Sequence, residues 1–233
     1  MDRATSVTRT THDAVSGRIA EARGEKAIKA SGQLAKIHQA LQPGLSEMFF
    51  ASKVVFVEGV EDTAYLTAYL NFLGFWDEYR KLECHIVATD GKGGMLQPLA
   101  VAGCLQIPAF AVIDADGDKP DKCGSREMHR KDNRTILGLC GVADPNPFPS
   151  EIFWGDRLVM WPSEIGRVVE EEIGKDQWEK CLAEADEKYG HAGGLRKNML
   201  HIASCLQTAW LAEKKSPSLQ KLCEKIMEFA KKN

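Results

Sequence analysis

A short apolar run followed by a helical segment recurs through the middle of this 233-residue chain, and this rhythm constrains the fold more than any other feature. The apolar runs are Lys53–Val57, His85–Ala88, Ala109–Ile113 and Arg157–Trp161. Continuous apolar runs of this length are typical of strands buried on both faces of a parallel sheet. Helical patterns follow at Glu61–Phe75, Met95–Cys104 and Ser163–Ile173, so right-handed β–α–β crossovers are expected. The predicted fold class is α/β, a parallel sheet flanked by helices.

Helical periodicity at both ends of the chain predicts additional helices outside the sheet. We expect a helical lead-in over residues 1–50, an α/β domain over residues 51–174 and a helical C-terminal subdomain over residues 175–233. Residues 117–150 are rich in Gly, Pro, Asp and Lys and are predicted to be a partly helical insertion. A chain of this length can bury one principal core, so a single main domain is expected.

Composition narrows the class of protein. The hydrophobic content of 44% is ordinary for a soluble protein, and no apolar stretch is long enough to span a membrane. The N-terminus lacks the apolar core of a secretory signal, so the expected location is cytoplasmic. The seven cysteines are odd in number and never spaced as CxxC, which favours buried thiols over disulfides or zinc ligands.

Acidic residues follow two of the predicted strands. Glu58 ends the first strand, Asp62 lies one turn into the next helix, and Asp114 and Asp116 end the third strand. Ligands of open parallel sheets bind beyond the carboxyl ends of the strands. Clustered carboxylates repel one another unless a cation neutralises them, so a divalent ion is expected here. Ligation by oxygen alone indicates Mg²⁺ or Mn²⁺, and Ca²⁺ also fits.

The specificity of this signal comes from the combination of two motifs. In an extended backbone, Asp114-Ala115-Asp116 places two carboxylates on one side, and Gly117 lets the chain turn away. An isolated DxD after an apolar strand is more often a surface turn. Joined to Val57-Glu58-Gly59 at the end of another strand, it favours a metal site suited to phosphodiester chemistry.

These two motifs on successive βα units resemble the Toprim domain, which is shared by topoisomerases, bacterial primases and several nucleases. More narrowly, residues 48–62 (MFFASKVVFVEGVED) and the Gly91-Lys92-Gly93-Gly94 segment are similar to the Toprim region of the OLD-family (overcoming lysogenization defect) nucleases. The resemblance covers about Ala51 to Asp118. It implies a Toprim-type fold and a metal-dependent DNA endonuclease that uses two divalent cations.

The resemblance also implies which residues act. The metal ligands would be Glu58, Asp62, Asp114, Asp116 and one later acid from the group Glu164, Glu170, Glu171 and Glu172. We select Glu170, because residues 168–173 (VVEEEI) are similar to the family's apolar-Glu-acid pattern. Glu58 could also act as the base. Lys197, on a late helix, would stabilise charge on the scissile phosphate.

The resemblance implies DNA as a partner. It also implies an N-terminal ABC-type ATPase domain, which would lie outside this sequence because the chain contains no Walker A loop. A homo-oligomer formed through that missing part is also implied, and no membrane partner is expected. Two alternatives stay open. One is the Toprim module of a primase or topoisomerase, which the lack of a zinc ribbon and of a distinctive tyrosine disfavours. The other is a non-catalytic DNA-binding recombination module, which would bind DNA without cleaving it when metal is added.

Overall fold

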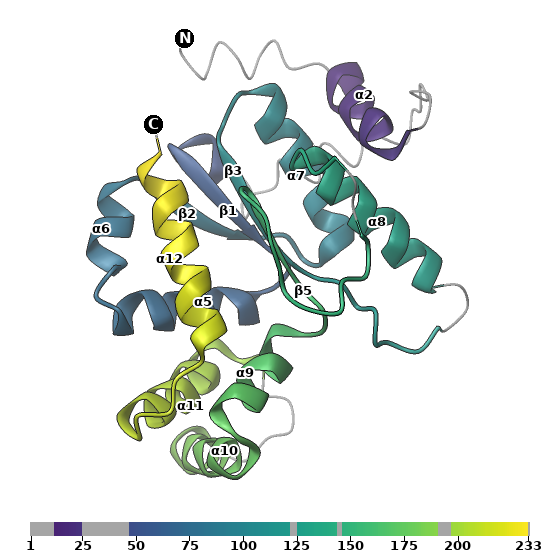
Figure 1. Ribbon diagram of the computed structural model, residues 1–233. Helices are drawn as coiled ribbons and strands as arrows, with labels where there is room; N and C mark the ends of the chain where they lie inside the picture. Colours follow the sequence, from purple (N-terminus) through teal and green to yellow (C-terminus); the bar gives the residue numbers. More distant parts are fainter. Residues whose placement is uncertain (1–11, 25–46, 122–124, 144–145, 191–196, 233) are drawn as a thin grey trace. The chain divides into compact units, whose positions relative to one another are not determined.

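A computed structural model describes residues 12–24, 47–121, 125–143, 146–190 and 197–232 of the chain (Figure 1). The chain divides into two compact units. Unit 1 comprises Met1–Glu58 and Glu83–Ser163, and unit 2 comprises Gly59–Leu82 and Glu164–Asn233. Among the described residues there is no helix with the length and apolar content needed to cross a bilayer. The domain boundaries expected at residues 50 and 174 stay predictions.

Unit 1 is built on a five-stranded sheet with the order β2-β1-β3-β5-β4. The strands are β1 (Lys53–Val57), β2 (Cys84–Ala88), β3 (Ala109–Asp114), β4 (Phe153–Trp154) and β5 (Leu158–Trp161). All neighbouring pairs are parallel except β4 and β5. The four predicted strands are confirmed. The antiparallel strand β4 was not predicted, because two residues are too few to produce a periodic pattern.

Three helices of unit 1 pack together beside this sheet: α2 (His12–Arg23), α7 (Lys92–Cys104) and α8 (Ser125–Leu139) (Figure 1). A short 3₁₀ helix, η1 (Glu47–Phe49), precedes β1. Alternate residues of β1, Val54 and Phe56, are buried in the same apolar cluster as Leu99 of α7 and Ile136 of α8. A fully buried side chain of this size stabilises the fold by roughly 1.5–3 kcal/mol. This core fixes α7 and α8 relative to the strand ends.

Unit 2 is helical. Its helices are α5 (Val60–Phe72), α6 (Trp76–Lys81), α9 (Ile165–Ile173), α10 (Lys175–Tyr189), α11 (Met199–Leu211) and α12 (Pro217–Lys231). Helix α5 contacts α6, α11 and α12 and so forms the centre of the unit. The Tyr69 hydroxyl of α5 accepts a 2.7 Å hydrogen bond from the backbone N–H of Ser216. Ser216 is the N-cap of α12, with Pro217 at its first position, which is the pattern of a helix start.

The predicted α/β fold class, with additional helices near both ends, is confirmed. Helix α8 lies within the insertion predicted over residues 117–150, and helices α10 to α12 occupy the C-terminal region predicted to be helical. Part of the predicted N-terminal helical segment, residues 25–46, lies outside the described residues. The six described cysteines are free thiols, as expected for a chain without a disulfide framework, and Cys123 lies outside the described residues.

Candidate active site at the strand ends

The carboxyl ends of β1 and β3 lie side by side in unit 1. The two strands are parallel neighbours, with Val57 opposite Val112. Strand β2, which follows β1 in the chain, pairs with one edge of β1, and β3 pairs with the opposite edge of β1. Strand order therefore reverses between β1 and β3, which is where open α/β sheets bind ligands. Glu58 and Asp114 stand at this point.

Glu58 links the two strand ends. Its carboxylate Oε1 accepts a 2.8 Å hydrogen bond from the backbone N–H of Asp114, and its carbonyl oxygen accepts one of 2.7 Å from the N–H of Gly91. Burial raises the pKa of the Glu58 carboxyl above its ordinary value, against the opposing charge of Lys92. A buried carboxylate of this kind gains from a nearby cation, because the cation offsets the loss of solvation.

Asp116 is surrounded by cationic side chains. Its Oδ2 lies 2.7 Å from Lys92 Nζ and 3.4 Å from His129 Nδ1, and its Oδ1 lies 2.6 Å from Lys119 Nζ. Burial would raise the pKa of Asp116, but the ammonium groups of Lys92 and Lys119 outweigh it and hold that pKa below its ordinary value. Asp116 is therefore an ionised carboxylate inside unit 1.

The backbone at Asp116 differs from the extended geometry expected for the DxD motif. Asp116 has φ 57°, in the left-handed region, so the turn begins at the second aspartate and not at Gly117. Asp is among the residues that tolerate this region best. The turn directs Asp116 toward Lys92 and Lys119, whereas Asp114 remains the last residue of β3.

Hydrogen bonds to both backbone groups of Ala115 fix the residue between the two aspartates. The Ala115 N–H donates to the Trp161 carbonyl at 2.7 Å, and the Ala115 carbonyl accepts from Asn133 Nδ2 at 2.8 Å. Asn133 is fully buried on α8 and donates a second bond, of 2.7 Å, to the Pro147 carbonyl. Helix α8 thus fixes the loop that carries both aspartates.

The Gly91-Lys92-Gly93-Gly94 segment forms the turn from β2 into α7. Gly91 has φ 88°, a conformation that side chains disfavour. A Cβ on Gly94 would lie 1.9 Å from the Thr89 carbonyl oxygen, so only glycine fits there without movement of the backbone. This close approach positions Lys92, the first residue of α7, beside Asp116.

Sequence reasoning missed Lys92, Lys119 and His129 as members of this site. A signal for Lys92 was present, since a lysine in a glycine-rich turn after a parallel strand is placed near the strand ends. Lys119 follows the DxD motif by three residues and could have been paired with it. His129 had no local signal, because its approach to Asp116 depends on how α8 packs.

A divalent cation such as Mg²⁺ requires several oxygen ligands. Glu58 and Asp114 offer carboxylate oxygens at adjoining strand ends, and the raised pKa of Glu58 fits a position next to a cation. Asp116 already has ammonium partners. Within the described ranges, no three His, Cys, Asp or Glu side chains are grouped so as to hold a metal ion. Glu58 and Asp114 supply carboxylate oxygens, the ligand type that a divalent cation prefers, whereas both oxygens of Asp116 are paired with lysine ammonium groups.

Asp62, predicted as a ligand, belongs to unit 2. Its Oδ2 accepts a 2.8 Å hydrogen bond from the backbone N–H of Gly59, which precedes α5. An acid at the third helical position that caps the N-terminus in this way is half of a capping box. Asp62 is buried, and its carboxylate caps the N-terminus of α5.

Four glutamates near α9 were candidates for the later metal ligand, and their surroundings differ. Glu172 accepts hydrogen bonds from Ser216 and Ser218 at the start of α12, and Glu171 pairs with Arg167 on the surface at 3.4 Å. Glu164 is the exposed N-cap of α9.

Glu170 is partly buried. Burial is the main cause of the raised pKa of the Tyr65 hydroxyl, and the charges of Glu170 and Asp62 contribute to it. Within unit 2, Glu170 is thus the candidate that neighbours the same tyrosine as Asp62.

Lys197 is exposed and lies 3.1 Å from the Glu61 carboxylate at the first turn of α5. It therefore neighbours the helix turn that carries Asp62. The predicted residues fall into two groups: unit 1 brings Glu58, Asp114 and Asp116 together, and unit 2 contains Asp62, Glu170 and Lys197.

The chain matches a known protein family and is similar to a solved structure. Residues 49–116 match the family described as overcoming lysogenization defect protein-like, TOPRIM domain. Among solved structures, the chain is similar to the C-terminal region of the Burkholderia pseudomallei OLD protein, with 16% sequence identity and a TM-score of 0.47 over 77% of this chain and 98% of that chain. No curated protein matches the sequence. The range that matches the family begins before β1 and ends at Asp116, so it contains both acidic motifs.

Proposed function

We propose, on the premise that residues 49–116 form an OLD-like Toprim domain, that this chain is the catalytic part of a divalent-metal-dependent DNA endonuclease. The observation that carries the proposal is the hydrogen bond from the Asp114 backbone N–H to the Glu58 carboxylate at the point where strand order reverses. This contact holds the Glu58 carboxylate against the end of β3, where ligands of such sheets bind.

Glu58 and Asp114 would hold the cation in unit 1, and Asp116 would join them by exchanging Lys92 or Lys119 for it. Mg²⁺ or Mn²⁺, bound as one of two ions, would activate a water and neutralise charge on the phosphate. Glu58 would also serve as the base that accepts a proton from that water. The assignments of Asp62, Glu170 and Lys197 to the same reaction rest on the sequence resemblance alone.

Lys92 and Lys119 would keep Asp116 ionised and oriented while the DNA is absent. Their charges oppose the repulsion among the carboxylates, so the loop can adopt one conformation before substrate arrives. Asn133 contributes by fixing the backbone between the two aspartates. Such preorganisation lowers the reorganisation needed during the reaction.

The experiment uses supercoiled plasmid incubated with the full chain and Mg²⁺, Mn²⁺ or Ca²⁺ in separate reactions. Conversion to open circles is expected for the wild type, with a loss of at least about a hundredfold for Glu58→Gln and for Asp114→Asn. Glu151→Gln, an exposed acid of unit 1, is the matched control and should keep the wild-type rate. Nicking that survives both active-site substitutions would refute the proposal.

A second candidate function is a DNA-binding module that does not cleave. The pairing of Asp116 with Lys92 favours it, because an acid already neutralised by lysine does not require a metal ion. This function predicts DNA binding by the wild type with no nicking in any of the three metals. It also predicts that Mn²⁺ leaves the thermal unfolding temperature unchanged, whereas a ligated ion would raise it.

A further inference from the structure

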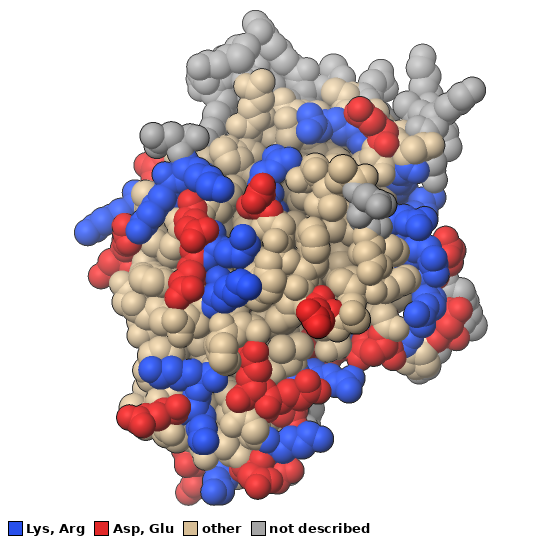
Figure 2. All heavy atoms as spheres, viewed as in Figure 1, with Lys and Arg blue, Asp and Glu red and all other residues tan. Residues whose placement is uncertain are grey.

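Helix α8 carries a row of arginines on one side. Arg126, Arg130 and Arg134 occur at intervals of four residues, so they lie on the same helix face over about 12 Å. We call these three residues the arginine stripe. Figure 2 shows Lys and Arg side chains gathered over α8, at the right of the view. The whole chain has a formal charge of −3, so this gathering is a local feature.

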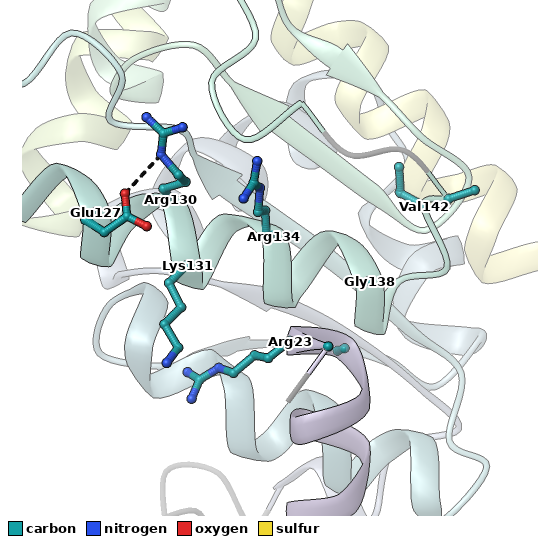
Figure 3. Close-up of a pocket in the computed structure, with 10 residues that line it drawn as sticks. Arg23, Glu127, Arg130, Lys131, Arg134, Gly138 and Val142 are labelled. Atoms are coloured by element: carbon teal, nitrogen blue, oxygen red, sulfur yellow. Dashed lines mark ion pairs between the residues drawn. The ribbon is translucent and has the colours of Figure 1, made fainter. Parts of the chain in front are cut away.

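A hollow of about 550 Å³ lies between α2 and α8 within unit 1 (Figure 3). Its lining includes the cationic side chains of Arg23, Arg130, Lys131 and Arg134 and a single acid, Glu127. Figure 3 shows Lys131 of α8 and Arg23 of α2 pointing toward one another. Cations brought together in this way repel one another and favour the binding of an anion.

The arginines differ in whether an acidic side chain already pairs with their charge. Arg130 lies 3.3 Å from the Glu127 carboxylate, and Arg23 lies 3.5 Å from Asp132 and donates to Thr135 Oγ1. Arg134 is exposed, and its side chain has no ion-pair partner among the described residues. Arg134 is therefore the member of the stripe best able to take a new ligand.

Two arginines of the stripe are held by one aromatic ring. The guanidinium carbons of Arg126 and Arg130 lie 5.1 and 5.5 Å from the centre of the Phe148 ring. Stacking of this kind restricts the long side chains before any ligand binds. Guanidinium groups match phosphate oxygens by paired hydrogen bonds, so a preorganised arginine row suits the binding of phosphate.

The same helix also holds the acidic loop. Four-residue spacing places His129 and Asn133 on a face of α8 different from the stripe, where they contact Asp116 and Ala115. A phosphate bound on the stripe is thus kept at a fixed position relative to Glu58 and Asp114, all within unit 1. A row of arginines suits the repeated phosphates of a strand better than one free anion.

We propose that the arginine stripe, with the hollow between α2 and α8, binds the phosphate backbone of the DNA whose cleavage is assigned to Glu58 and Asp114. The inference rests on the proposed nuclease function for the identity of the DNA as substrate. The inference adds the location of the bound DNA strand and the side chains that bind it. The contact is with phosphates, so it does not depend on base sequence.

The test measures binding apart from cleavage. The full chain is titrated against a fluorescein-labelled 20-base-pair duplex in EDTA, with fluorescence anisotropy read at several salt concentrations. The double variant Arg126→Gln/Arg134→Gln should bind about tenfold more weakly, and its slope of log K against log salt should fall by about 2, near 0.9 for each lost phosphate contact. The single variant Arg134→Glu should weaken binding in the same direction.

A matched control pair, Arg80→Gln/Lys214→Gln, removes two exposed cations of unit 2 and should leave affinity and slope within about twofold of wild type. Urea midpoints of all variants check that each is folded. An unchanged affinity and slope in the stripe variants would overturn the inference, as would a wild type that does not bind the duplex at low salt. Displacement of the duplex by millimolar inorganic phosphate at constant ionic strength would assign the hollow to free phosphate and also overturn it.

The two proposals can fail separately. If the wild type binds DNA through the stripe but does not nick plasmid in Mg²⁺ or Mn²⁺, the proposed nuclease function fails and the inference about binding stands. If the wild type nicks plasmid and the stripe variants bind and nick like wild type, the inference fails and the nuclease function stands.

Discussion

Lys92 Nζ lies 2.7 Å from Asp116 Oδ2, and the two side chains are only 5% and 6% exposed. The pair joins the glycine-rich turn after β2 to the acidic loop after β3. Removal of one partner from a buried ion pair leaves the other charge without compensation, which is strongly destabilising. Lys119 and His129 also face Asp116 and reduce that effect.

Lys92→Met should therefore lower the free energy of unfolding by about 3 kcal/mol, measured by urea denaturation at pH 7. Lys119→Met is the matched control. Its ammonium group contacts the same aspartate, but its side chain is 45% exposed, so the loss should stay under about 1 kcal/mol. Equal losses in the two variants would show that burial of Lys92 does not matter to the pair.

The lowered pKa of Asp116 gives a pH dependence with a definite sign. Because its pKa is lower in the folded chain than in the unfolded chain, Asp116 stabilises the fold above its ordinary pKa of 3.8, and this contribution is lost as the pH falls toward the folded value. Asp116→Asn should therefore show a smaller decrease in stability than the wild type when the pH is lowered below about 4. Chemical denaturation at a series of pH values gives the slope, and Glu151→Gln should leave it unchanged.

Glu58 should behave in the opposite way. Burial raises its pKa, so ionisation of Glu58 destabilises the folded chain as the pH rises through its ordinary value of 4.5. Glu58→Gln keeps an acceptor for the Asp114 N–H but carries no charge. In EDTA at pH 7 this variant should be more stable than wild type by about 1 kcal/mol, the size of other gains seen at functional sites. A loss of stability would mean that the carboxylate is structural.

The close approach of Gly94 to Thr89 predicts a difference between neighbouring glycines. Gly94→Ala places a Cβ 1.9 Å from the Thr89 carbonyl oxygen and should lower the free energy of unfolding by at least about 2 kcal/mol. In Gly93→Ala the nearest atom would be Asp132 Oδ2 at 3.9 Å, and alanine favours the helix by about 0.5–1 kcal/mol. Urea midpoints should thus move in opposite directions, and a shared direction would contradict the geometry of the turn.

Asn133→Ala should destabilise unit 1 and slow nicking. The substitution leaves the buried carbonyls of Ala115 and Pro147 without donors, at about 1–3 kcal/mol for each unsatisfied group. The exposed Asn71 is the matched control, since its side chain donates a 2.7 Å bond to the Thr67 carbonyl on the surface of α5. Asn71→Ala should change stability by less than about 0.5 kcal/mol and leave nicking unchanged.

Much of the sheet could be predicted because its signals are local. The predicted run Lys53–Val57 coincides with β1, and the run Ala109–Ile113 is β3 without its last residue. Helix ends were less accurate, as α7 begins at Lys92 and not at Met95, because glycines at its start weaken the helical pattern. The OLD-like Toprim resemblance predicted from the two acidic motifs is confirmed over residues 49–116.

The sequence by itself determined the four parallel strands, and that Glu58, Asp114 and Asp116 lie at the ends of two of them, because an apolar run and the residues at its end are adjacent along the chain. Only the tertiary structure decided the partners of those acids. Lys92 precedes Asp116 by 24 residues, and its ammonium reaches the carboxylate because α7 packs on the sheet. His129 and Asn133 reach the same loop because of the packing of α8. Such charge pairing depends on distances between elements, which local spacing in a sequence does not encode.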